Sequence, residues 1–212
     1  MRKRLVFVII VLSVAASLFS AVVPESGRIA SYLRGTVSPS FVSEKVYSYP
    51  AKNGSLHFAL GADISADLFR NDGSAKWGFS TALYASYPLI SKHYENFAGS
   101  DIAERKGFLM ASAGISFRCT PSPYVDASLA LRAAVMSWDY FMEGVIMGLT
   151  VESMVDFFFT DSIFITGGLS LTNGFIKFTP SSGTAWFESG YSTLFFRARI
   201  GAGYRFGGDR KR

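Results

Sequence analysis

The clearest pattern in the chain is a strict alternation of residue types over 193–206, close to its end. Every second residue of this segment, beginning at Leu194, is apolar or aromatic, and three of the positions in between are arginine (Arg197, Arg199 and Arg205). Successive side chains of a β-strand point to opposite faces of the sheet. The segment therefore predicts a strand with one apolar face and one face of small and cationic groups.

The same alternation recurs in six segments further upstream. They cover residues 55–69, 76–89, 108–119, 125–135, 145–157 and 163–172. A weaker alternation over 28–41, which Gly35 and Pro39 disturb, supplies an eighth strand, because proline is tolerated at strand ends and bulges. The pattern as a whole predicts an all-β protein.

The connections between these strands alternate in length. Three are long, at 42–54, 91–107 and 174–191, one is intermediate, at 137–144, and three are short, at 71–74, 120–123 and 160–162. Transmembrane barrels show this asymmetry, with short periplasmic turns and longer extracellular loops. We therefore predict an eight-stranded antiparallel up-and-down transmembrane β-barrel over residues 22–206.

Charged residues indicate which face of the strands meets lipid. An eight-stranded barrel could also be soluble, with its apolar face turned inward around a ligand. Over the seven clear strands, however, the apolar face holds no Asp, Glu, Lys or Arg. The opposite face carries charges of both signs among many small residues, which suits a narrow lumen lined with ion pairs. The predicted lumen charge network consists of Asp63, Asp67, Lys76, Arg118, Asp126, Arg132, Glu152, Asp156, Arg197, Arg199 and Arg205.

Aromatic residues gather at the predicted periplasmic ends of the apolar face. Membrane barrels carry girdles of aromatic side chains at their two interfaces with water, where an amphipathic ring is stable. The residues expected in such a girdle are Trp77, Phe79, Phe117, Phe157, Tyr204 and Phe206. This clustering favours the membrane barrel over the soluble one.

The amino-terminal residues 1–21 have the features of a secretory signal peptide. Three basic residues precede an apolar stretch, and small residues that suit cleavage follow at Ala16 and Ala21. An uncleaved membrane anchor is the alternative, because the apolar stretch could almost span a bilayer. Residues 207–212 form a basic tail after the barrel, and Cys119, the single cysteine, can form no internal disulfide.

Composition limits the other classes of function. The net charge is +5, but six of the 21 basic residues stand in the runs 2–4 and 210–212, and no basic patch alternates with exposed aromatic residues. Nucleic-acid binding is therefore not expected. The sequence contains no metal-ligand cluster, phosphate-binding loop or dinucleotide motif, so no cofactor is expected.

The mature chain resembles the small outer-membrane barrels of diderm bacteria, of the OmpA/OmpX and OmpW types. In such families the final strand ends in an aromatic residue that the assembly machinery recognises; Phe206, with Tyr204 before it, matches this pattern. The family aromatic is typically terminal, whereas here Gly207 to Arg212 follow. The resemblance implies a monomer in the outer membrane, with lipid and the barrel-assembly machinery as partners.

Three functions remain open for such a barrel. The first is a non-enzymatic role in adhesion, envelope structure or host interaction through surface-exposed loops, since loops on a rigid scaffold usually carry binding. The second is a narrow, OmpW-like pore for small or hydrophobic solutes.

The third is an enzyme at the outer rim, because barrels that modify lipid A place Ser, His and an acid there. His57 lies near the extracellular end of its strand, and the loop that follows 76–89 holds Ser91, His93, Glu95 and Asp101. A hydrolytic serine needs a histidine base within hydrogen-bond reach and an acid that orients it. We expect the first function, with this loop as a solvated polar segment and no catalytic residues.

Overall fold

The computed structural model describes residues 29–48, 51–70, 75–94, 107–138, 144–181, 184–188 and 191–207. Within these ranges, side chains are not described for 45–48, 51–53, 75, 92–94, 179–181, 184–188 and 191. The predicted signal peptide at 1–21 lies outside the described residues, as does the basic tail after Gly207. Among the described residues there is no helix long and apolar enough to cross a membrane.

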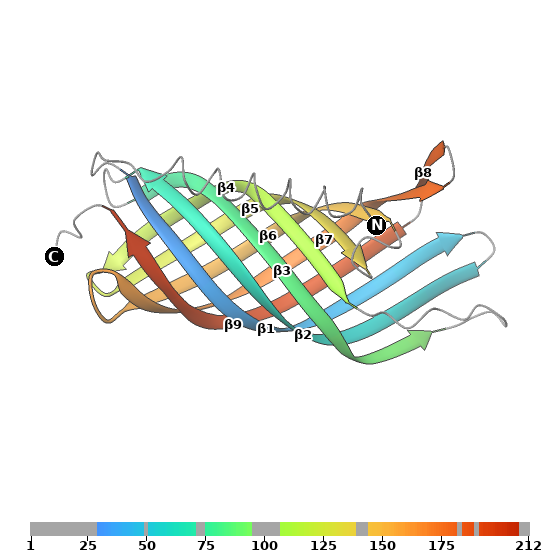
Figure 1. Ribbon diagram of the computed structural model, residues 1–212, viewed down its shortest axis with the longest axis horizontal. Coiled ribbons are helices and arrows are strands. Elements are labelled where there is room, and N and C mark those ends of the chain that lie inside the picture. Colours follow the sequence, from blue (N-terminus) through green and yellow to red (C-terminus); the bar gives the residue numbers. More distant parts are fainter. Residues whose placement is uncertain are drawn as a thin grey trace, which may run out of the picture.

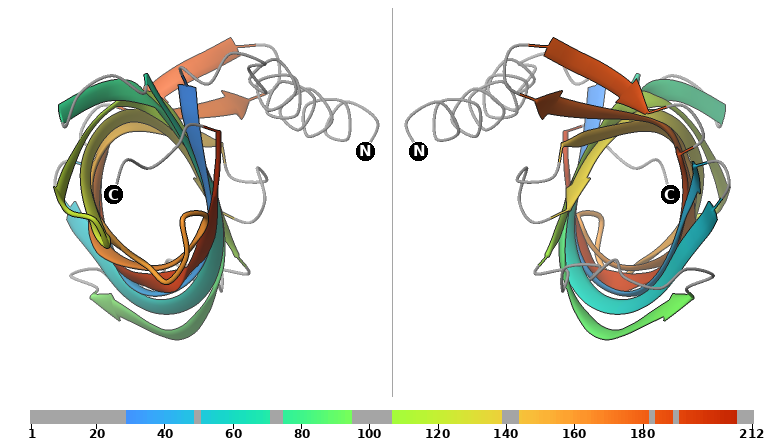
Figure 2. Two further views of the ribbon diagram at one scale, coloured as in Figure 1. Left: turned by 90° about the vertical axis from the view of Figure 1, so that its left-hand side faces the viewer. Right: turned by 90° about the vertical axis from the view of Figure 1, so that its right-hand side faces the viewer.

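The described chain folds into one antiparallel sheet that closes on itself (Figures 1 and 2). Its strands are β1 (Ile29–Ser48), β2 (Ala51–Arg70), β3 (Ala75–Tyr94), β4 (Phe108–Ser122), β5 (Val125–Trp138), β6 (Val145–Phe158), β7 (Ile163–Ser181), β8 (Thr184–Glu188) and β9 (Tyr191–Phe206). Each strand from β1 to β7 pairs with the next, and β9 lies between β7 and β1. Strand β8 pairs with the end of β7 alone, so β1 to β7 and β9 make a closed barrel of eight strands. The predicted fold is confirmed.

The seam that closes the barrel joins the weakest predicted strand to the clearest one. Strand β1 pairs with β9 from Ser31 opposite Phe206 to Val46 opposite Tyr191. The pairing keeps one register on both sides of Pro39, and Pro39 itself has no partner in β9. A proline has no N–H to give to the ladder, so it is tolerated where the ladder is interrupted.

The longer connections are shorter than the sequence predicted. Strands β1 and β2 continue into 42–54, β3 runs on to Tyr94, and 174–191 holds the end of β7, all of β8 and the start of β9. At the described positions of these ranges, 42–48, 51–54, 91–94, 174–181, 184–188 and 191, the prediction of loops was wrong. A hairpin that projects beyond the membrane has water on both faces, so its sequence needs no apolar alternation even though its backbone stays paired.

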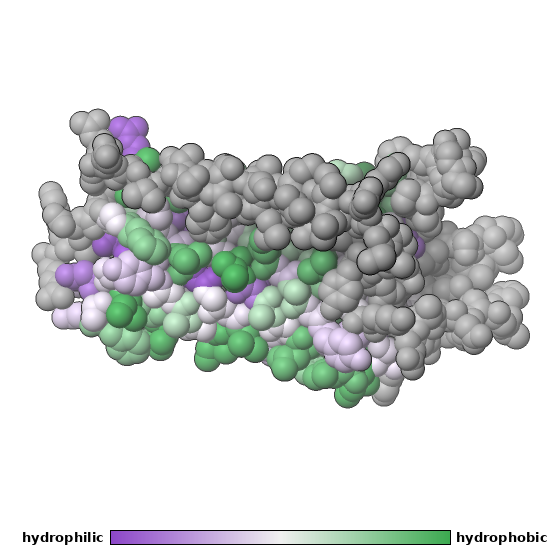
Figure 3. Space-filling view, in the orientation of Figure 1, coloured by the Kyte–Doolittle hydropathy of each residue, from purple (hydrophilic) through white to green (hydrophobic). Residues whose placement is uncertain are grey.

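The exterior of the barrel is apolar and its interior is polar. Large exposed apolar side chains recur on every barrel strand, for example Ile64 on β2, Leu131 on β5 and Ile200 on β9. Figure 3 shows hydrophobic residues, in green, over much of the described surface on the side that it displays. The buried residues include six arginines and six carboxylates in the described part of the chain. A soluble barrel has the opposite arrangement, so the structure is that of a barrel surrounded by lipid.

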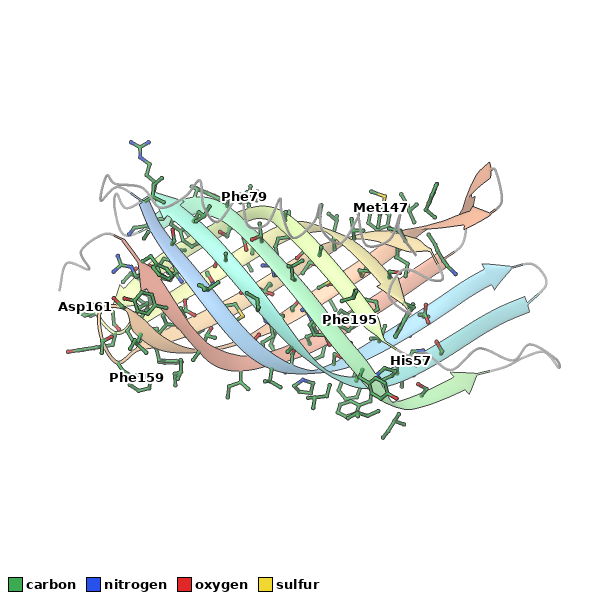
Figure 4. The ribbon with its side chains drawn as sticks, viewed as in Figure 1. His57, Phe79, Met147, Phe159, Asp161 and Phe195 are labelled. Atoms are coloured by element: carbon green, nitrogen blue, oxygen red, sulfur yellow. The ribbon has the colours of Figure 1, made fainter. Side chains whose placement is uncertain are left out.

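An arginine placed in the middle of the apolar exterior tests this orientation. The change Leu131→Arg should lower the free energy of unfolding by about 2–4 kcal/mol, because a lipid-facing cation near the bilayer midplane is costly. Guanidinium titration of the protein folded in lipid vesicles measures the effect. The control is Phe159→Arg at the short turn after β6, which Figure 4 labels at the end of the barrel and which should cost under about 1 kcal/mol. Equal effects of the two changes would contradict the orientation.

Candidate functional site

The inward side chains of β1 mark the levels of the lumen from one end to the other. Tyr32 lies in an aromatic layer at the end with the short turns, and Arg34 and Thr36 follow in two successive ion networks. Val42 then lies in a second apolar layer, and Glu44 reaches the rim from which the long hairpins project. The even-numbered residues of β1 thus sample every level in turn, as a strand requires.

Aromatic side chains close the lumen at the end with the short turns. Tyr32 packs edge-on against Phe69 and Phe158, with ring centroids 5.7 and 6.4 Å apart, and Phe164 lies 6.1 Å away. All four rings are buried. The guanidinium of Arg118 lies over Tyr32, 3.3 Å from the ring centroid, so the next level begins directly on this layer.

The lower ion network is centred on Asp156. Arg34 grips this carboxylate with two hydrogen bonds, from Nε at 3.0 Å and from Nη2 at 2.7 Å, and its Nη1 donates to Asp67 at 2.5 Å. Arg118 donates to Asp156 as well and also to Asp126, at 3.3 Å. Two-point contact between Arg and a carboxylate is among the strongest hydrogen bonds in proteins.

The upper ion network joins two carboxylates to three arginines. Glu152 is paired with Arg132 and Arg199, and Arg197 lies 3.8 Å from the same carboxylate. Asp63 is paired with Arg199 and lies 3.9 Å from Arg197. Since these five residues come from β2, β5, β6 and β9, the network ties opposite walls of the barrel together.

A second apolar layer separates the ion networks from the rim. It contains Val42, Tyr84, Phe108, Met110, Ala134, Met136, Trp138, Ile146 and Phe195, all buried. Phe108 is central, with its ring centroid 4.8 Å from that of Trp138 and 4.9 Å from that of Phe195. Side chains therefore occupy the lumen at each described level, as the small circumference of eight strands allows.

Polar side chains meet at the rim above this layer. His57 Nδ1 lies 2.8 Å from Ser91 Oγ, and His57 Nε2 lies 2.8 Å from Ser55 Oγ. The Ser55 hydroxyl donates to Glu44 Oε2 at 3.3 Å, and that oxygen is 3.6 Å from His57 Nε2. The Trp138 ring lies against His57, with centroids 4.9 Å apart. Figure 4 shows His57 near the end of the barrel with the projecting hairpins.

Most residues of the predicted charge network lie in the lumen. Ten of the eleven are buried there: Asp63, Asp67, Arg118, Asp126, Arg132, Glu152, Asp156, Arg197, Arg199 and Arg205. Lys76 is only half-buried and lies opposite Arg118 at the end of β3. The prediction omitted Arg34 and Glu44, which are both buried. They belong to the weakly patterned strand. Their even-numbered positions, which face the lumen, were the signal in the sequence that could have identified them.

The six predicted interfacial aromatics lie on the outer face, near the end with the short turns. Trp77 is 68% exposed, and its ring centroid lies 5.2 Å from that of Phe117 across β3 and β4. Phe79, Phe157, Tyr204 and Phe206 also reach the exterior, and Tyr124 and Phe159 at the turns add two exposed rings that were not predicted.

Of the candidate rim residues, the structure describes the side chains of Ser91 and His57. Ser91 belongs to β3 and contacts His57, which comes from β2. His93 lies two residues further along β3, where side chains are not described, and Glu95 and Asp101 lie outside the described residues. Glu44 takes the place expected for an acid from the loop. Within the described ranges, no three His, Cys, Asp or Glu side chains are arranged to hold a metal ion.

The fold and its polar interior define a closed eight-stranded membrane β-barrel. A comparison with solved structures finds matches to small outer-membrane barrels. Neisserial surface protein A matches with a TM-score of 0.48 and 14% identity, over 85% of this chain and 98% of that one. The attachment invasion locus protein Ail of Yersinia pestis matches at 0.46 and 14%, over 84% and 99%. OprG of Pseudomonas aeruginosa matches at 0.44 and 12%, over 84% and 96%.

At these identities the likeness concerns the fold alone. No protein-family model matches the sequence, and no curated protein matches it.

Removing one carboxylate tests how the upper ion network contributes to stability. The change Glu152→Gln should lower the free energy of unfolding by about 3–5 kcal/mol, because buried arginines then lose their counter-charge. Adding Arg132→Met to the same chain should recover part of that loss, since it removes one of those cations. Guanidinium titration in lipid vesicles compares the three proteins. A Glu152→Gln protein as stable as the wild type would show that these ion pairs make no net contribution to the free energy of unfolding.

Proposed function

We propose that this protein is an integral outer-membrane barrel that serves as a rigid base for extracellular hairpins, which bind a partner outside the cell. The observation that carries the proposal is the closed lumen beneath projecting strands. The role is one of adhesion or interaction rather than conduction.

The filled lumen argues against a pore along the barrel axis. The apolar layer around Phe108 and the aromatic layer around Tyr32 lie at opposite ends, and two ion networks fill the levels between them. Arg118, Arg132 and Arg197 are at most 1% exposed. A solute on the axis would have to displace paired buried charges, which is costly.

The strand lengths favour an extracellular role. A tilted strand needs about 9–11 residues to cross a bilayer. Strands β1, β2 and β3 each have 20 residues, and β7 has 19. Figure 1 shows the β1–β2 hairpin and the β7–β8 hairpin projecting from the same end of the barrel. Paired strands are already ordered and lose little conformational entropy on binding, so they suit the display of a recognition surface.

The same proposal assigns the location and the general partners. The apolar exterior requires lipid, and barrels of this kind belong in the outer membrane of a diderm bacterium, reached through a cleaved signal peptide. Tyr204 and Phe206, whose ring centroids are 4.6 Å apart at the end of β9, are suited to contact with the assembly machinery. The closed sheet leaves no barrel edge unpaired, which is consistent with a monomer.

Electrical recording distinguishes the closed barrel from a pore. Protein reconstituted into planar bilayers should give no conductance steps above the background, because the described lumen is filled. The double substitution Phe108→Ala and Phe195→Ala opens the layer below the rim and serves as a comparison for a widened lumen. Regular steps from the wild-type protein would contradict the proposal and support the pore.

Trimming the projecting hairpins tests their role in binding. Replacing 46–53 by an Asn-Gly turn is compatible with the register, because Lys45 lies opposite Gly54. A laboratory bacterium that displays the full-length protein should adhere to epithelial monolayers or to immobilised extracellular-matrix proteins, and the trimmed variant should lose at least about ten-fold of that adherence.

An Asn-Gly insertion after Asp161, at the opposite end of the barrel in Figure 4, is the control and should change nothing. Heat-modifiable gel migration verifies that each variant is folded. Equal adherence of all three proteins would contradict the proposal.

A further inference from the structure

A β-bulge in β3 turns Ser91 toward His57. Ala59 lies opposite Pro88, but Phe58 lies opposite Ile90, so Leu89 is an extra residue in β3. Without this bulge, Ser91 would share the lipid-facing side of Leu89, since both numbers are odd. With the bulge, Ser91 lies directly opposite His57 and on its side of the sheet. Bulges frequently re-aim a side chain next to active sites.

The Glu44 carboxylate determines which group donates and which accepts in each hydrogen bond at the rim. An ionised Glu44 carboxylate can only accept, so the Ser55 hydroxyl donates to it. Ser55 Oγ must then accept the hydrogen bond that it shares with His57, which places a proton on His57 Nε2. In that tautomer Nδ1 carries the lone pair and accepts from the Ser91 hydroxyl.

The hydrogen-bonded side chains at the rim differ in burial, and the difference suits a nucleophile and its base. His57 is fully buried, with the Trp138 ring packed against it at a tilt of 54°, and Ser55 and Glu44 are buried beside it. Ser91, the outermost of these hydrogen-bonded side chains, is exposed. The base is therefore held in place and shielded, whereas the hydroxyl can be reached by another molecule.

We propose that this rim is an ester hydrolase site, with Ser91 as nucleophile and His57 as general base. Glu44 is a positioning residue that acts through Ser55 and stabilises the imidazolium once it forms, from 3.6 Å. This activity goes beyond the binding role of the hairpins, and it revises the expectation of a barrel without catalytic residues. Two of its members, Ser91 and His57, were candidates from the sequence, and Glu44 of β1 was not.

The reaction balances with water as the only co-reactant. Ser91 Oγ attacks the ester carbonyl carbon while its proton passes to His57 Nδ1. The bond to the leaving alcohol breaks, and the alcohol oxygen takes that proton. A water molecule then gives a proton to His57 and attacks the acyl-serine, which releases the carboxylic acid and returns the proton to Ser91.

The surroundings of Ser91 indicate a lipid ester as substrate. Three of the four residues that precede it on β3 are exposed on the outer face: Tyr87 is 62% exposed, and Leu89 and Ile90 are each 57% exposed. An acyl chain in the membrane would run along these side chains and bring its ester to the level of Ser91. Two sources carry such an ester in an outer leaflet, glycerophospholipids and acylated saccharide lipids, and the chemistry at the serine is the same for both.

The test measures fatty-acid release by the folded full-length protein in two separate assays. One uses vesicles of phosphatidylethanolamine and phosphatidylglycerol, and the other uses purified lipopolysaccharide. Release from either should fall about 100-fold or more in Ser91→Ala and in His57→Gln, because each removes a member of the reacting pair. The assay that responds identifies the source of the ester.

A covalent probe checks the nucleophile independently of the substrate. A fluorophosphonate should label the wild-type protein at Ser91, as located by mass spectrometry, and should not label Ser91→Ala. The matched control is Ser43→Ala. Ser43 lies on β1 next to Glu44 in sequence but on the opposite face of the sheet, so this variant should retain both labelling and release.

A positioning role for Glu44 has its own signature. Glu44→Gln should lower kcat by about 10–100-fold with KM nearly unchanged, and Glu44→Asp should recover part of the loss. Heat-modifiable migration shows that every variant is folded. No release from either lipid, label on Ser55 instead of Ser91, or full activity in folded Ser91→Ala would each overturn the proposal, and the rim would then be a hydrogen-bonded structural cluster.

Discussion

The absence of water in the hydrocarbon core is the constraint on which the rest of this structure depends. A backbone N–H or C=O that faces lipid must find its partner within the protein, so a sheet can cross a membrane only if it closes. Closure rests on the pairing of β1 with β9, which retains one register past Pro39. With eight strands the circumference is small, and everything that the lumen contains follows from that size.

A narrow lumen must be filled, and its charges must be matched. The six buried arginines have six buried carboxylates in the described part of the chain, and one of these, Glu44, lies apart from the ion networks at the rim. Small residues make room for the large ones: a Cβ on Gly61 would lie 2.5 Å from the hydroxyl of Tyr84. That hydroxyl lies 2.9 Å from Ser40 Oγ, so a glycine on one strand is needed for a hydrogen bond between two others.

The sequence predicted those strands whose residues alternate between two different environments, with a period of two. The strands with one face in lipid and one in the lumen were found, along with their inward charges, because the two environments reject each other's residues. The projecting hairpins were missed, because their sequences do not keep the apolar alternation of the membrane-spanning segments. Glu44 lies on such a hairpin, and the partner of Ser91 depends on the bulge at Leu89, which shifts the parity without leaving a periodic signal. Pro88 was the available cue, because proline in a strand interior often accompanies a bulge.

The same closure that seals the lumen explains how a reactive arrangement can form at its edge. The polar rim draws side chains from β1, β2 and β3, and Trp138 reaches His57 from β5 on top of the packed layer around Phe108. Each of these strands is held by two neighbours, so the rim side chains stand on a surface with little freedom to rearrange. Hairpins that recognise a partner can vary above this surface, because their sequences are not required to fill the lumen or to face lipid. In the roles proposed here, chemistry belongs to the rim and recognition to the hairpins above it, along the axis of one small barrel.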